Sequence, residues 1–159
     1  MTSDKRIVYL DYVDLIDEDT GNTVTEQILQ VITPAPAFTG TLEQIASEVI
    51  PKHIEDYKIV GVDALPDRVF RNAWKVEGDE IKEDLAKSKV LCHKKRRRSR
   101  DAEMKPFDDI IAKQIPGKNA GQAAVERQKL RNKYALDQAE IDEATDINVL
   151  KEKYRAYSE

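Results

Sequence analysis

The pattern of this sequence changes near Gly78. Before that residue, three runs rich in β-branched and aromatic side chains are typical of strands. These runs are residues 6–13, 24–32 and 57–62. After Gly78, residues 79–105 contain neither Gly nor Pro, and charged side chains separate the apolar ones at helical spacing. The charge changes as well: residues 1–78 hold 7 Lys and Arg against 14 Asp and Glu, whereas the remainder holds 19 against 16.

We therefore predict an α+β fold with the strands first and the helices second. The first two runs are expected to pair as a hairpin, and the third adds another strand. Between them, Thr41 is placed to cap a short helix that Pro51 ends. The predicted parts are a ββαβ head over residues 1–66, an extended arm over residues 67–78 and a helical region over residues 79–159. Because helices joined by short connections pack antiparallel, the last part is expected to be a helical hairpin or a small bundle.

The helical region is divided by its breakers. A first helix is predicted from Asp79 to Pro106, and a short helix is predicted between Pro106 and the Pro-Gly pair at 116–117. Another begins near Asn119, and Asp146 caps the last one. In the first helix, the positions that recur at helical spacing are Ile81, Leu85, Ser88 and Cys92.

Several classes of protein are excluded by composition. The single Cys has no intramolecular disulfide partner and fits a reducing compartment. No stretch approaches the roughly 20 apolar residues that span a bilayer, and residues 1–14 lack the apolar run of a signal peptide. We expect a soluble protein made in the cytoplasm, with no membrane partner.

The sequence also contains no motif for a cofactor or for catalysis. Cys92 and His93 are adjacent rather than spaced as zinc ligands are, and the Gly residues form neither a phosphate-binding loop nor a dinucleotide fingerprint. Consecutive helical residues diverge by about 100°, so His93 cannot act well as a base for Cys92. We expect no catalytic residue, no metal and no cofactor.

A dense basic run is the most conspicuous local feature. It consists of Lys94, Lys95, Arg96, Arg97 and Arg98. Five consecutive cations can neutralise phosphates without reading base sequence, which makes nucleic acid one candidate partner. The favoured interpretation is a solvated helix end, where the helix dipole favours cations and they pair with nearby carboxylates. Contact with an acidic protein partner is the third.

The segment at residues 68–74 concentrates aromatic and cationic side chains. If it is extended, alternation places Phe70 and Trp74 on one side and Arg71 on the other. Such residues are common interface anchors, so Phe70, Arg71 and Trp74, together with Ile81 and Leu85, are predicted to bind a partner. The equally weighted alternative is that Phe70 and Trp74 pack the helix onto the chain's own sheet.

At this segment the chain resembles a family of small tailed-bacteriophage proteins that are usually encoded near tail or tail-fibre genes. The resemblance rests on the string Arg-x-Phe-Arg-Asn-Ala-Trp at residues 68–74, preceded by Leu-Pro-Asp at 65–67. It continues through residues 81–89, the His and basic residues at 93–98, and residues 141–145. It covers most of the chain from Asp56 onward.

The resemblance implies a non-enzymatic structural protein of the phage tail or tail-fibre attachment region. Its partners would be other tail or fibre proteins, it would be present in several copies, and it would reside in the virion after synthesis in the host cytoplasm. Two alternatives stay open. One is a tail-fibre assembly chaperone absent from the mature particle, because the C-terminal helices are similar to those ending such chaperones. The other is a phage nucleic-acid-binding or host-takeover factor that uses residues 94–98.

Overall fold

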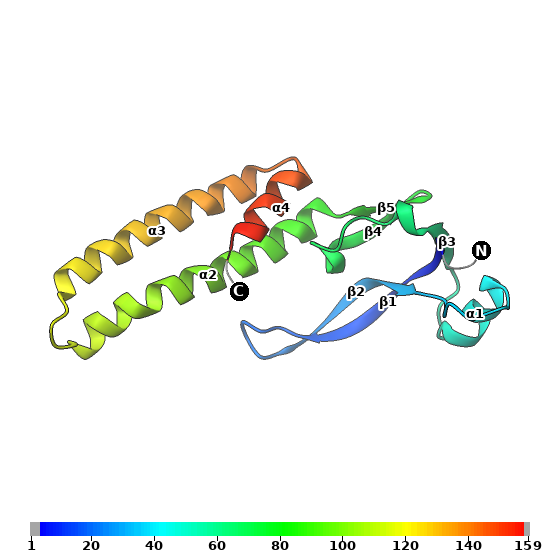
Figure 1. Ribbon diagram of the computed structural model, residues 1–159, viewed down its shortest axis with the longest axis horizontal. Helices are drawn as coiled ribbons and strands as arrows, with labels where there is room; N and C mark the ends of the chain where they lie inside the picture. The colour runs from blue at the N-terminus through cyan, green and yellow to red at the C-terminus, as the bar shows by residue number, and fades with distance from the viewer. Residues whose placement is uncertain (1–3, 158–159) are drawn as a thin grey trace. The chain divides into compact units, whose positions relative to one another are not determined.

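The computed structural model describes residues 4–157 and divides the chain into two compact units, one ending at Asp84 and the other beginning at Leu85 (Figure 1). The first unit contains strands and one short helix, and the second is entirely helical. The predicted α+β class is therefore confirmed. The predicted boundaries need correction, because residues 67–78 belong to the first unit and the helical unit begins six residues after the expected position.

The first unit is built on a three-stranded antiparallel sheet. Strands β1 (Lys5–Ile16) and β2 (Thr23–Ile32) form the predicted hairpin, and β3 (Lys58–Gly61) pairs with the other edge of β1. The turn closes through a hydrogen bond from Asp17 N to Asn22 O of 2.8 Å. Residue 21 in this turn is Gly, because the backbone there has a φ of 72°, which other residues rarely adopt.

Helix α1 (Leu42–Val49) is the predicted short helix, and it covers one face of this sheet. Thr41 Oγ1 accepts a hydrogen bond from Gln44 N, and the Gln44 side chain accepts one from Thr41 N, which forms a complete capping box. The apolar residues Leu42 and Ile45 of the helix then pack against Ile7 of β1.

Residues 74–83, which were predicted as the end of the arm and the start of a helix, instead form a second hairpin, and Arg71–Ala73 before them form a short 3-10 helix. Strand β4 (Trp74–Glu77) pairs with β5 (Glu80–Glu83), and Gly78 takes a φ of 62° in the two-residue turn between them. Ile81 therefore lies on a strand rather than at the start of the expected helical stripe. The correction has a physical cause: alternation along the two strands directs both Trp74 and Ile81 into the core, where they pack with Val8.

The helical unit comprises α2 (Leu85–Lys113), α3 (Ala120–Glu143) and α4 (Ile147–Ala156). Helices α2 and α3 lie side by side as an antiparallel hairpin in Figure 1, which agrees with the prediction. None of the helices between residues 4 and 157 combines the length and the apolar character that crossing a membrane requires.

The helix boundaries follow the predicted start near Asn119 and the predicted cap at Asp146, but not every predicted breaker. Asn119 and Asp146 cap α3 and α4 by accepting hydrogen bonds from backbone amides two or three residues later. Pro106, by contrast, lies inside α2, so the predicted separate short helix is wrong. Proline removes one backbone hydrogen bond, and the contacts of α2 with α3 on both sides of this position hold the helix together.

Candidate functional site

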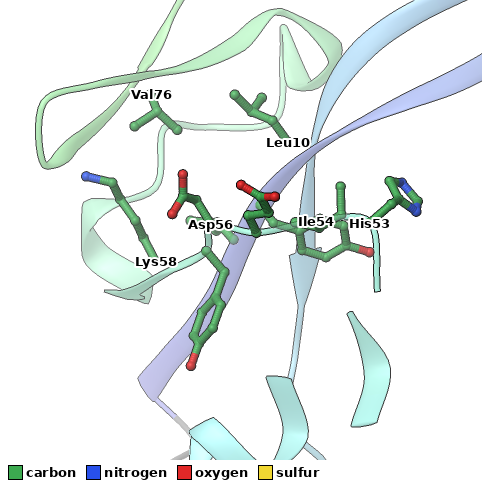
Figure 2. A pocket seen from close by; sticks show the side chains of 10 residues that line it. Leu10, His53, Ile54, Asp56, Lys58 and Val76 are labelled. Carbon is green, nitrogen blue, oxygen red and sulfur yellow. The ribbon is translucent and has the colours of Figure 1, made fainter. Parts of the chain in front are cut away.

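A groove of about 530 Å³ lies in the first unit. Its walls are Val8–Leu10 of β1, residues 53–58 and Val76 of β4. In Figure 2, Leu10 and Val76 lie on one side of this groove, and the segment that carries Ile54 and Asp56 lies on the other. A concave space with mixed apolar and polar walls is the usual place for a ligand or a partner segment.

The groove exists because β1 is much longer than β3. The pairing of β1 with β3 ends at Val8 and Lys58, whereas its pairing with β2 continues as far as Ile16 and Thr23. Within residues 4–157, the edge of β1 beyond Val8 that faces away from β2 therefore pairs with no strand. An unpaired edge presents backbone donors and acceptors to which another strand can add.

One local contact occupies part of this edge. Tyr12 N donates to Asp11 Oδ1 at 2.8 Å, and His53 Nε2 lies 3.0 Å from the same oxygen. Hydrogen bonding by His53 lowers the pKa of the Asp11 carboxyl, which keeps it ionised and able to accept both contacts. The amide of Tyr12 is thus satisfied without a strand partner, and the groove ends at this point.

The walls of the groove differ in chemistry. Val8, Leu10, Ile54 and Val76 make its surface partly apolar. At the rim, Lys58 Nζ donates a hydrogen bond to Asp79 Oδ1 at 3.0 Å.

Two exposed carboxylates, Glu55 and Asp56, lie nearby at the same rim. The whole surrounding unit is acidic, as the composition of residues 1–78 shows. The groove therefore matches an extended segment that carries an apolar side chain beside Lys or Arg.

The residues predicted to bind a partner are not gathered on one surface. Phe70 is fully buried, Trp74 is 4% exposed and Ile81 is 5% exposed, so these side chains lie in the chain's own core. Arg71 stacks on Trp74, with 4.4 Å from Cζ to the ring centroid, and burial lowers the pKa of its guanidinium. Leu85 is the first residue of α2 and belongs to the other unit. This arrangement favours a packing role for Phe70, Trp74 and Ile81.

The basic run is distributed around α2 instead of forming one charged face. Arg96 is only 5% exposed, and it donates from Nε to His93 Nδ1 at 3.3 Å and from Nη1 to Tyr134 O at 3.4 Å. Lys95 Nζ lies 4.3 Å from the centroid of the Tyr154 ring.

The other three cations of the run, Lys94, Arg97 and Arg98, also interact with neighbouring groups of the chain. These contacts favour pairing within the helical unit over the neutralisation of phosphates.

Cys92 lies in a setting that suppresses thiol chemistry. It is fully buried, its Sγ contacts Leu150 O at 3.8 Å, and burial raises the pKa of the thiol to about 11. His93 faces Asp142 at 2.8 Å from Nε2 to Oδ1. Throughout residues 4–157, no three His, Cys, Asp or Glu side chains are grouped in a way that would hold a metal ion.

Comparison of the chain with protein-family models, with curated proteins and with solved structures finds no match. Reasoning from the sequence did not predict the groove. One signal was available: the strand run at 6–13 is followed through a Pro-bounded segment by a shorter run at 57–62. Such a mismatch in strand length leaves an edge unpaired.

Proposed function

We propose that this chain is a non-enzymatic structural protein of a bacteriophage tail or tail-fibre attachment region that acts through protein–protein interfaces. The proposal places the interface at the groove beside β1, where an extended segment of a neighbouring tail or fibre protein adds to the sheet edge. One observation carries it: β1 continues for eight residues, Tyr9 to Ile16, after its pairing with β3 ends. The phage setting rests on the resemblance of residues 68–74.

The edge geometry supports a strand as the occupant. Added strands gain affinity from main-chain hydrogen bonds and specificity from pockets for alternate side chains. The groove offers the second feature beside the first, because Leu10 and Val76 line it next to the open edge. The contact between Asp11 and His53 limits the open edge of β1 to a short segment. A short segment suits an attachment contact.

Exposed apolar side chains on the same hairpin support an interface as well. Beyond the third strand, β1 and β2 continue as a two-stranded ribbon, and Tyr12 and Ile16 are about 70% exposed there. A two-stranded ribbon is marginally stable in water by itself. A partner that covers these side chains would stabilise both the ribbon and the complex.

The test uses charge changes at the rim that leave the core untouched. A double variant, Glu55→Gln with Asp56→Asn, is compared with the matched control Glu43→Gln with Glu48→Gln, which removes two exposed carboxylates from α1. In phage assembled with each chain, mass spectrometry of purified particles measures its copy number. We expect the rim variant to be depleted and the control to match the unmodified chain.

The outcomes separate the alternatives. A chain that binds a fibre protein but is absent from purified particles is an assembly chaperone. Binding to duplex DNA that falls steeply with salt and is lost when residues 94–98 are replaced by Gln identifies a nucleic-acid-binding factor. Equal incorporation of the rim variant and its control contradicts the groove as the interface.

A further inference from the structure

A second cleft lies within the helical unit, in the seam between α2 and α3, and has a volume of about 360 Å³. Arg100, Met104 and Asp108 follow one another at four-residue spacing on α2, and Arg127 and Arg131 do so on α3. Side chains four residues apart lie on the same face of a helix. The two faces therefore meet across the seam and bring three guanidinium groups to one cleft.

The charges in this cleft do not balance. Arg127 Nε lies 2.7 Å from Asp108 Oδ1, and Arg100 Nε lies 2.9 Å from Asp101 Oδ1. Arg131 forms no hydrogen bond or ion pair with another residue of the described chain. Three cations thus face two carboxylates, and one guanidinium fork is left without an anion.

The floor of the cleft is shielded from water. Met104 is buried, and the ion-paired atoms Arg127 Nε and Asp108 Oδ1 have almost no solvent-exposed surface, although they are not aligned as a hydrogen bond. Charges beside such a floor act more strongly than charges in open water, because the local dielectric constant is lower, although Arg131 itself is exposed. A guanidinium group is also planar and can donate two parallel hydrogen bonds to a phosphate-type oxyanion.

We propose that this cleft binds a phosphate-type oxyanion, held mainly by Arg131 and Arg100, with the Arg127 and Asp108 pair as its fixed wall. This site is independent of the groove beside β1. The same chemistry is presented by free phosphate and by a phosphodiester of a nucleic acid strand, and the experiment separates the two sources.

The experiment follows the arginine Nε–H signals of the full chain by nitrogen-15 NMR. Sodium phosphate is added in one series, and a short single-stranded oligonucleotide of mixed sequence in another, each against sodium chloride at equal ionic strength. We expect saturable shifts at Arg131 and Arg100. A larger affinity for the oligonucleotide assigns the phosphodiester as the source, and comparable or weaker binding assigns the free anion.

Three variants define the site. Arg131→Gln is expected to weaken binding about tenfold, which is the effect of losing one charge-assisted contact. Lys129→Gln removes the same charge from the same helix outside the cleft, and should leave binding unchanged. Asp101→Asn frees the fork of Arg100 and should tighten binding. All three positions are exposed, so folding is preserved.

Two results would overturn the proposal. One is the absence of any saturable shift with either probe. The other is equal weakening in Arg131→Gln and Lys129→Gln, which would show a general effect of net charge rather than a site.

Discussion

The hydroxyl oxygen of Tyr134 lies 3.0 Å from Ser99 Oγ in the buried seam between α3 and α2. The same hydroxyl donates to Glu103 Oε1 at 2.7 Å, so one side chain of α3 contacts two successive turns of α2. Because Tyr134 is 1% exposed, its side of these hydrogen bonds is shielded from bulk water. The pairing of the two long helices is therefore specified by polar contacts as well as by apolar packing.

Replacing Tyr134 by Phe tests this role. The ring keeps its packing, whereas Ser99 and Glu103 each lose a partner, and the free energy of unfolding is expected to fall by about 1–2 kcal/mol. Urea unfolding followed by far-ultraviolet circular dichroism measures the change. Tyr12→Phe, at an exposed position, is the control and should have almost no effect. Equal stability of the Tyr134 variant and the unmodified protein would show that the seam depends on packing alone.

Truncating Trp74 tests the core of the first unit. Trp74 packs with Val8 and Ile81, so Trp74→Ala should lower the free energy of unfolding by about 3–5 kcal/mol through lost burial and the cavity left behind. Chemical denaturation followed by NMR signals of residues 5–84 reports on this unit. Val49→Ala, which removes a half-exposed side chain from α1, should cost far less. An unchanged unfolding midpoint for Trp74→Ala would contradict the assigned packing.

The buried thiol predicts a dependence of stability on alkaline pH. In the unfolded chain Cys92 ionises near its ordinary pKa of 9.0, whereas in the folded chain burial raises this pKa to about 11. The unfolded state therefore loses the proton first, and the contribution of Cys92 to stability is present below pH 9 and is lost between about pH 9 and 11. Burial also raises the pKa of Tyr157, which extends the same trend to higher pH.

Unfolding free energies of the unmodified chain and of Cys92→Ala, measured between about pH 8 and 11, isolate this contribution. The unmodified chain should lose stability more steeply as the pH rises. Below pH 8.5 or so, alkylation of the thiol should be slow in the folded chain and fast in urea, because the thiolate forms in the unfolded state. Parallel pH profiles for the two chains would mean that Cys92 is not the group responsible.

Reasoning from the sequence located the parts of the candidate groove but not their juxtaposition. The strand runs around β1 and β3 were predicted, because their composition and alternation are local properties. That residues 53–58 line the open edge of β1 depends on the register, which pairs Val8 with Lys58 and then stops. Register is set by which side chains become buried together, and no short stretch of sequence contains that information.

Structural elements can be predicted directly from the amino-acid sequence when the interactions that form them lie within a few residues of one another. The caps at Thr41, Asn119 and Asp146 belong to this class, because a side-chain oxygen and the amides that it accepts from lie within one turn. The hairpin of β1 and β2 belongs to it as well.

Tertiary structure decided the rest, where a local preference competed with a distant contact. Pro106 stays inside α2, although proline disfavours a helix interior, because α3 packs along that helix. Arg96 is buried, although its neighbours suggested a solvated run, because Tyr134 O and His93 receive its hydrogen bonds. Trp74 and Ile81 lie on opposite strands of a hairpin and enter the same core cluster, because burying both side chains outweighs the helical spacing of Ile81 with Leu85.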